Sequence, residues 1–332
     1  MSKTEDKERK NDHMAHLADR YKDKLTTLPD KKVPLFGSLY MYQGFWYKCN
    51  KLQNIFSIES LLLAQETFKA HPADIYVTTF PKSGTTWIKS LVFATVNRTR
   101  YKNNTFSTHP LSRSNPHKCV PFIETELYRN TPNYPDEHSP RLLSTHTCYT
   151  SLPQTIVDCG CRIVYMCRNP KDVLVYFFHF LSKMRNKYQI PEIKLEDLFE
   201  TFANGSIMYG PYWDHVKGYY KASIKHPTRI LFLTYEDMTR DTANGVKRLA
   251  EFLGVPFTKE EEVYGSVDDI VRLCSLENLK DVDKDGLSHG IPNETFYREG
   301  KIGDWANHLT SEMIETLDQI TKENFLGLNI SF

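Results

Sequence analysis

The chain has 332 residues, 40% of them hydrophobic, which is enough for one large α/β domain or two smaller ones. Its 42 Lys and Arg residues nearly balance its 41 Asp and Glu residues, and the formal net charge is +1. This balance argues against a general electrostatic attraction to nucleic acid or membrane, so any anion site must be local.

The N-terminal stretch is rich in charged residues. We expect residues 1–30 to form a partly disordered segment with some helix, ahead of a single domain at residues 31–332. This stretch has no apolar core typical of a signal peptide, and no apolar run in the chain approaches membrane length. The seven cysteines lack the CxxC or Cys/His spacing of zinc sites. We therefore expect a cytoplasmic protein with reduced thiols and no metal.

Three apolar, β-rich runs predict buried parallel strands, Ile75–Thr79, Arg162–Cys167 and Arg229–Thr234. A shorter strand, Arg141–Thr145, is predicted just before His146. Helices are predicted after Gly84, from Asn169-Pro170, and over about Thr242–Leu253, where Gly254 ends the helix. Strands that alternate with helices predict an α/β fold, a single domain with a central parallel β-sheet flanked by helices.

The segment FPKSGTTW, Phe80–Trp87, joins the first strand to its helix and contains every part of an anion-binding loop. Gly84 permits a tight turn, and the amides after it lie at a helix N-terminus, which favours negative charge. Lys82 adds a cation. Hydroxyl donors follow at Ser83, Thr85 and Thr86. The lysine precedes the glycine, so this is not the GxxxxGK[ST] loop of metal-dependent nucleotide hydrolases, and a small-molecule kinase is disfavoured.

Several motifs together resemble those of the cytosolic sulfotransferases, from about Leu35 to the C-terminus. Pro81–Trp87 resembles the family's P-loop-like 5′-phosphosulfate loop, and CRNPKD at Cys167–Asp172 resembles its 3′-phosphate region. FYREGKIGDW at Phe296–Trp305 resembles its C-terminal RKGxxGDW segment. The motifs around Asn115-Pro-His117 and Gly210–His215 are most similar to plant members.

The resemblance implies transfer of a sulfuryl group from 3′-phosphoadenosine 5′-phosphosulfate (PAPS) to a hydroxyl group of a small organic acceptor, leaving PAP, without a metal. It implies that Lys82 acts on the bridging oxygen and that His146, which follows a predicted strand, is the general base. The implied donor-binding residues are Lys82, Ser83, Gly84, Thr85, Thr86, Trp87, Arg168, Tyr176, Tyr235, Arg298, Glu299 and Gly300.

The acceptor itself is not readable from the sequence. Plant-like relatives use flavonoids, steroids, hydroxylated hormones or desulfoglucosinolates. We expect an aromatic pocket from Phe45, Phe80, His109, Phe122, Tyr149, Phe178 and Phe180. The aromatic-rich residues 39–47 either line this pocket or pack on a core. The animal dimer motif KxxxTVxxxE lacks its lysine and valine here, at Ala306 and Ser311, so we expect a monomer without nucleic-acid or membrane partners.

Three departures from the family pattern fall at the adenosine 3′-phosphate end. Tyr176 stands where serine is usual, Glu299 where lysine is usual, and Leu276 where an aromatic side chain often faces the adenine. We therefore expect weaker PAPS binding than in typical relatives, or a shifted phosphate. If Glu299 points to solvent, backbone amides carry the phosphate instead. The alternative function is a catalytically weak relative that binds PAPS or PAP.

Overall fold

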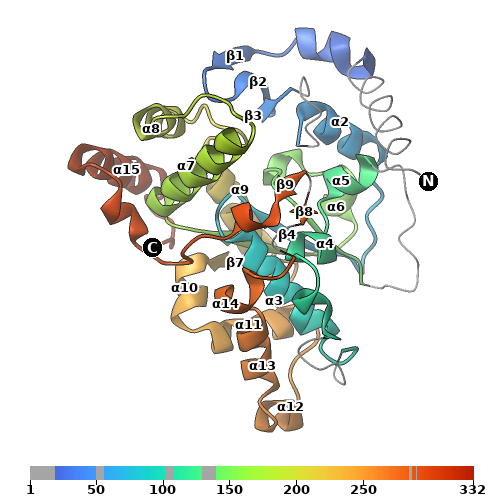
Figure 1. The fold of residues 1–332 in the computed structure, drawn as a ribbon. Helices are drawn as coiled ribbons and strands as arrows, with labels where there is room; N and C mark the ends of the chain where they lie inside the picture. The colour runs from blue at the N-terminus through green and yellow to red at the C-terminus, as the bar shows by residue number, and fades with distance from the viewer. Residues whose placement is uncertain (1–18, 50–55, 102–107, 129–139, 284–285, 289) are drawn as a thin grey trace.

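The computed structural model describes residues 19–332 apart from residues 50–55, 102–107, 129–139, 284–285 and 289 (Figure 1). Most of the segment expected to be partly disordered, residues 1–18, lies outside the described residues. Residues 19–26 are helical, and their Tyr21 and Leu25 side chains are buried in the hydrophobic core. The described part of this segment is therefore attached to the domain.

A four-stranded parallel sheet forms the centre of the molecule, with the strand order β5-β4-β6-β7. Its strands are β4 (Ile75–Thr79), β5 (Leu142–Thr145), β6 (Arg162–Cys167) and β7 (Ile230–Thr234). All four predicted runs are confirmed, each within one residue at either end. Because the strands are parallel, their carboxyl ends lie at the same edge of the sheet.

Helices follow three of these strands as predicted. They are α3 (Thr85–Asn97), α7 (Pro170–Lys187) and, after the short α10 (Tyr235–Arg240), α11 (Thr242–Phe252). The Asn169 side chain caps α7 by accepting a hydrogen bond from the Lys171 amide at 3.0 Å. None of the helices in the described chain has the length and apolarity that a membrane crossing requires.

The remaining helices pack around the sheet (Figure 1). They are α2 (Ile58–Thr67), α4 (Pro116–Cys119), α5 (Ile123–Tyr128), α6 (Gln154–Asp158), α8 (Leu195–Ala203), α9 (Tyr212–Lys225), α12 (Lys259–Val263), α13 (Ser266–Leu273), α14 (Leu276–Leu279) and α15 (Ser311–Asn324). A short hairpin, β8 (Leu287–Ser288) and β9 (Ile291–Pro292), precedes the C-terminal segment.

Each face of the sheet belongs to its own hydrophobic cluster. Along β6, Ile163 and Tyr165 join one cluster, whereas Val164 and Met166 join the other, because successive side chains of a strand alternate. Helices α7, α8, α9 and α15 contribute to the first cluster, and α3, α11 and α13 contribute to the second. The predicted arrangement of helices on both faces is therefore confirmed.

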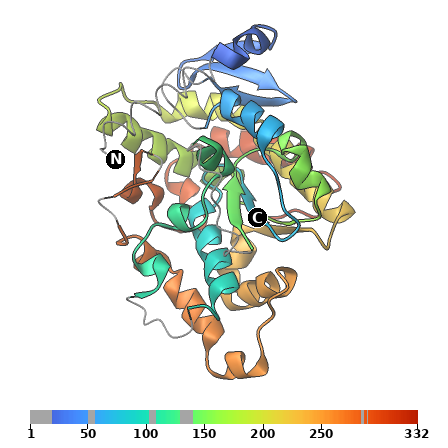
Figure 2. The same cartoon turned by 90° about the vertical axis from the view of Figure 1, so that its right-hand side faces the viewer.

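A small antiparallel sheet, which the sequence pattern did not indicate, lies at one end of the molecule, opposite α12 (Figures 1 and 2). Its strands are β1 (Asp30–Val33), β2 (Gly37–Tyr42) and β3 (Phe45–Lys48). Gln43 and Gly44 form the β2–β3 turn, with φ of 51° and 87°. Leu39, Phe45 and Tyr47 are buried in the first cluster, so the core is where most of this aromatic segment packs.

Candidate active site

A cavity of about 600 Å³ lies beyond the carboxyl ends of the central strands. Each strand is followed directly, or within three residues, by a side chain that lines it. These side chains are Lys82 after β4, His146 after β5, Arg168 after β6 and Tyr235 after β7. The parallel sheet thus brings together four residues that lie up to 153 positions apart in the sequence.

The loop before α3 is held in a conformation that favours an anion. Gly84 has a φ of 92°, and an added Cβ would lie 2.6 Å from Met166 and 2.7 Å from Tyr235. Lys82 has a positive φ of 68°, which is uncommon for a residue with a side chain. The N-cap residue of α3 is Gly84, which has no side chain to cap the first amides of the helix, so these amides are available to a ligand.

Lys82 is partly buried, and its ammonium lies 4.0 Å from the ring centroid of Phe180 and 5.9 Å from that of Phe296. Burial, followed by the positive charges of Lys183 and Arg168, lowers its pKa to about 7. An anion bound in the cavity would favour the charged form of Lys82, because its negative charge would offset the effect of burial and that of the two neighbouring cations.

His146 has a defined proton arrangement. Its Nδ1 lies 2.8 Å from the Thr79 carbonyl oxygen, which can only accept, so Nδ1 carries the proton and Nε2 does not. The ring packs 4.8 Å from that of Phe122, and both residues line the cavity. Burial lowers the pKa of His146 to about 3, although the bond to Thr79 opposes this shift. The imidazole is therefore neutral at physiological pH.

A buried chain of side chains holds the backbone of His146. His215 Nε2 lies 3.0 Å from the His146 carbonyl oxygen, and the Tyr165 hydroxyl lies 2.9 Å from His215 Nδ1. Both His215 and Tyr165 are fully buried. No local sequence pattern indicates this pair, because only the tertiary fold brings β6 and α9 next to His146.

A second buried chain reaches the cavity through Thr86. The Lys89 ammonium lies 3.0 Å from His117 Nδ1, and His117 Nε2 lies 3.2 Å from the Thr86 hydroxyl. Lys89 also lies 3.4 Å from the Phe122 ring centroid and is fully buried. Burial lowers its pKa well below the usual range, and the charge of Glu124 opposes this shift. Sequence reasoning singled out neither Lys89 nor His117 as a site residue.

Arg168 lies between two aromatic rings. Its guanidinium carbon is 4.0 Å from the ring centroid of Tyr176 and 4.2 Å from that of Tyr235. Its Nη2 donates to the Lys301 carbonyl at 2.5 Å, and Asp172 lies at 3.6 Å. Trp87 packs against Tyr235 with a centroid distance of 5.2 Å, so the rings of both form one wall of the cavity.

The C-terminal segment closes this end of the cavity. Tyr235 donates to the Gly300 carbonyl at 2.9 Å, and the Lys301 amide donates to the Tyr176 hydroxyl at 3.1 Å. Arg298 pairs with Asp304. Glu299 forms an exposed ion pair with Lys301 at 2.9 Å, which lowers the pKa of the Glu299 carboxyl.

Unpartnered donors mark where an anion fits. Ser83 Oγ, Arg168 Nε and Arg298 Nη1 are buried and have no hydrogen-bond partner among the described residues. Two arginines with spare donors suit a phosphate, and the α3 amides suit a second anionic group. Within the described chain, no three His, Cys, Asp or Glu side chains gather as a metal site. The residues therefore fit a nucleotide with two anionic groups.

The structure brings together eleven of the twelve predicted donor-site residues as lining of the cavity. These are Lys82, Gly84, Thr85, Thr86, Trp87, Arg168, Tyr176, Tyr235, Arg298, Glu299 and Gly300. Ser83 is buried beside them and does not line the cavity. Leu276, the expected site of a missing adenine contact, also lines it.

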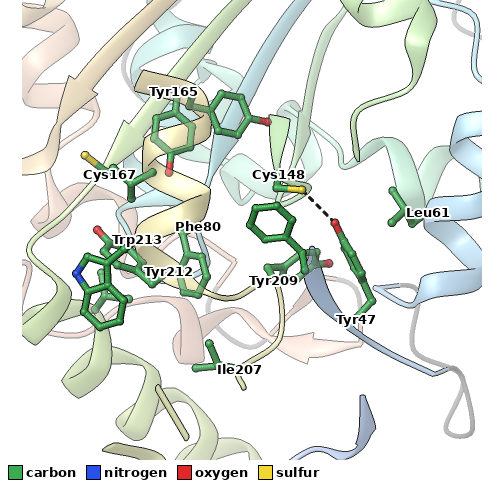
Figure 3. Packing of buried hydrophobic residues seen from close by; sticks show 14 of the residues in the cluster. Tyr47, Leu61, Phe80, Cys148, Tyr165, Cys167, Ile207, Tyr209, Tyr212 and Trp213 are labelled. Atoms are coloured by element: carbon green, nitrogen blue, oxygen red, sulfur yellow. Dashed lines mark hydrogen bonds between the residues drawn. The ribbon is translucent and has the colours of Figure 1, made fainter. Parts of the chain in front are cut away.

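Of the seven residues expected in the acceptor pocket, only Phe122 and Phe180 line the cavity. Phe80 points into the core instead, 5.1 Å from the Tyr212 ring (Figure 3). His109 accepts from the Leu111 amide at 3.1 Å and caps a short helical turn.

The other three predicted pocket residues also lie elsewhere. Phe45 packs on His215 and Tyr149 packs on Tyr219, at ring distances of 6.2 and 5.7 Å. Phe178 packs against the first hydrophobic cluster. On α7, Phe177 and Phe180 line the cavity, and the helical period turns Phe178 away from that face. The pocket is instead completed by Leu35, Phe36, Lys48, Phe56, Phe177, Leu181, Met184, Arg185, Tyr188, Ile190, Met208 and Tyr209.

An α/β sheet with an anion loop, spare arginine donors and an aromatic wall defines a class of enzymes that use a phosphorylated nucleotide. Residues 72–329 match the family model described as the sulfotransferase domain. Cytosolic sulfotransferase 5 of Arabidopsis thaliana is 40% identical over 323 residues, which are 95% of this chain and 97% of the relative. Flavonol 4′-sulfotransferase of Flaveria chlorifolia is 44% identical over 292 residues, 86% and 88% of the two chains.

Solved structures agree with these similarities. A sulphotransferase of Arabidopsis thaliana superimposes with a TM-score of 0.73 at 36% identity and covers 93% of this chain and 94% of its own. A mouse sulfotransferase complexed with PAP has a TM-score of 0.65 at 25% identity and covers 87% and 94%. The chain therefore belongs to the sulfotransferase family and is a PAPS-dependent transferase.

Proposed function

We propose that the protein transfers the sulfuryl group of PAPS to a hydroxyl group of a small organic acceptor, with His146 as general base. The orientation of His146 carries this proposal. Because Nδ1 donates to the Thr79 carbonyl, Nε2 is the free base in a cavity that Lys82 also lines.

In the proposed complex, the α3 amides and Thr85 bind the 5′-phosphosulfate. Arg168 and Arg298 bind the 3′-phosphate through donors that have no partner among the described residues. Trp87 and Tyr235 contact the adenine. Tyr176 holds the Lys301 backbone, so its proposed role is to position the segment that closes over the nucleotide.

The transfer step depends on two groups, a base that accepts the proton of the acceptor hydroxyl and a donor to the bridging oxygen. As the acceptor oxygen bonds to sulfur, its proton passes to His146 Nε2, and the bond from sulfur to the bridging oxygen breaks. Lys82 donates a hydrogen bond to that bridging oxygen, where negative charge develops. PAP and the sulfate ester leave, and His146 returns its proton to solvent.

Thr86 is the proposed donor to the sulfuryl oxygens. A charged Lys89 can only donate to His117 Nδ1, so His117 carries its proton on Nε2 and donates to Thr86 Oγ1. The Thr86 hydroxyl hydrogen is then free to point into the cavity, which Thr86 lines. Lys89 and His117 are thus proposed as positioning residues.

We propose a hydroxylated acceptor of the flavonoid, steroid, hormone or desulfoglucosinolate type, a cytoplasmic location and a monomeric state. Size-exclusion chromatography with light scattering would test the last point, and a dimer would contradict it.

A PAPS-dependent screen across these acceptor classes, read by mass spectrometry, tests the proposed function. We expect sulfonated product that requires PAPS and forms without added metal. PAP binding without any product would favour the catalytically weak alternative, which the engaged hydroxyl of Tyr176 leaves open. Turnover of ATP in place of PAPS would contradict both.

A further inference from the structure

The acceptor end of the cavity carries two cations that the proposed transfer does not use. Lys48 is the last residue of β3, and Arg185 lies in the last turn of α7; both line the cavity. The turns of α7 that carry Arg185 also present Leu181 and Met184 to it. The two charges therefore lie on otherwise apolar walls.

No carboxylate in the described chain balances these two cations. The Lys48 ammonium forms no hydrogen bond or ion pair with any described residue. Arg185 donates only to carbonyl oxygens of the described residues, those of Pro191 at 2.5 Å and Leu35 at 3.5 Å. Glu299 is the only described carboxylate that lines the cavity, and it pairs with Lys301 at the donor end.

Burial lowers the pKa of Lys48, and the positive charge of Arg185 adds to this shift. The two cations are thus close enough to repel each other. Because a partly buried cation without a counter-charge loses hydration, an anion bound near both would recover this free energy.

Building on the proposed sulfuryl transfer, we propose that the natural acceptor is itself an anion, such as a carboxylate. Its charged group binds at Lys48 and Arg185 while its hydroxyl reaches His146. Phe180, whose ring contacts Lys82, and Arg185 lie on the same helix, α7, and the apolar side chains of Leu181 and Met184 lie between them in the sequence. We therefore expect an apolar body to join the hydroxyl and the anionic group of the acceptor.

A matched pair of probes isolates the charge: 3-(4-hydroxyphenyl)propanoate and its methyl ester. Calorimetry with the full chain in saturating PAP measures their binding without any chemistry. We expect the acid to bind about tenfold more tightly than the ester, as for a hydrogen bond between charged groups. Equal affinities, or no binding of the acid, would overturn the inference.

Variants assign the preference to the two cations. Lys48→Met should reduce the acid preference to below about threefold, whereas Arg185→Lys, which keeps the charge, should retain most of it. Lys187→Met is the control, because Lys187 is an exposed cation on the same turn of α7 that does not line the cavity. A full preference in Lys48→Met would contradict the inference.

Sulfonation of the neutral methyl ester with PAPS reports separately on the proposed function. If neither probe is sulfonated while the acid still binds preferentially, the proposed transfer fails and the anion subsite stands. If the ester is sulfonated and the acid is not preferred, the subsite fails and the transfer stands.

Discussion

His146 owes its proposed role to neighbours that are distant in the sequence. The Thr79 carbonyl fixes which ring nitrogen carries the proton, and His215 holds the His146 carbonyl from α9. Burial then keeps the ring neutral. The same histidine on an exposed loop would lack the defined tautomer that leaves Nε2 free to accept a proton, so its surroundings make it a candidate base.

The lowered pKa of Lys82 predicts that nucleotide binding depends on pH. Its pKa is about 7 in the free protein, and a bound anion must raise it. Affinity should therefore be greatest below pH 7 and fall as the pH rises, because binding then requires proton uptake. Calorimetry with PAP from about pH 7 to 9, in buffers of different ionisation enthalpy, should detect this uptake.

Lys82→Met is the control for that measurement, since it should bind PAP more weakly and take up no proton near pH 8. The phosphates of PAP are already ionised in this range, so they contribute little to the uptake. A constant affinity across the range in the unmodified protein would contradict the prediction.

Lys89→Met tests the chain that ends at Thr86. Methionine has a similar shape but cannot donate to His117, so the Thr86 hydroxyl loses its defined direction. We expect kcat to fall about tenfold and the melting temperature to fall, because His117 and Glu124 lose a buried partner. An unchanged kcat would show that the chain has only a structural role.

At the scale of elements, the N-termini of two helices and one C-terminal segment build the proposed donor site. The start of α3 supplies uncapped amides, and the start of α7 supplies Arg168 and Asp172. Asp172 accepts from the Gly303 and Trp305 amides at 2.9 and 3.3 Å, which anchors the C-terminal segment. In the proposed complex, each helix thus binds the nucleotide or the segment that closes over it.

The structure predicts different effects of Glu299 and Tyr176 on binding of the 3′-phosphate. Lys301 balances the charge of Glu299, and both are exposed, so Glu299→Lys alone should change PAP affinity by less than about fivefold. Tyr176→Phe should weaken it about threefold or more, because the Lys301 amide loses its partner. Calorimetry measures the PAP affinity of both variants. A large gain in affinity in Glu299→Lys would show that Glu299 is the main cause of weak binding.

On the scale of the whole molecule, the parts that the sequence predicts are those with local causes. The four strands follow from short apolar runs, and the anion loop follows from contiguous residues. The acceptor pocket was predicted poorly, since Phe80 and Phe122 look alike in the sequence but only Phe122 lines the cavity. The proposed roles of Lys48, Lys89 and Arg185 depend on tertiary neighbours that no local sequence pattern indicates.

The central claim, sulfuryl transfer with His146 as base, is tested most directly by single-turnover transfer from PAPS to a simple phenol. His146→Ala should slow the transfer by about a thousandfold while leaving PAP affinity, measured by calorimetry, within about twofold. A His146→Ala variant that transfers sulfuryl as fast as the unmodified protein would contradict the account.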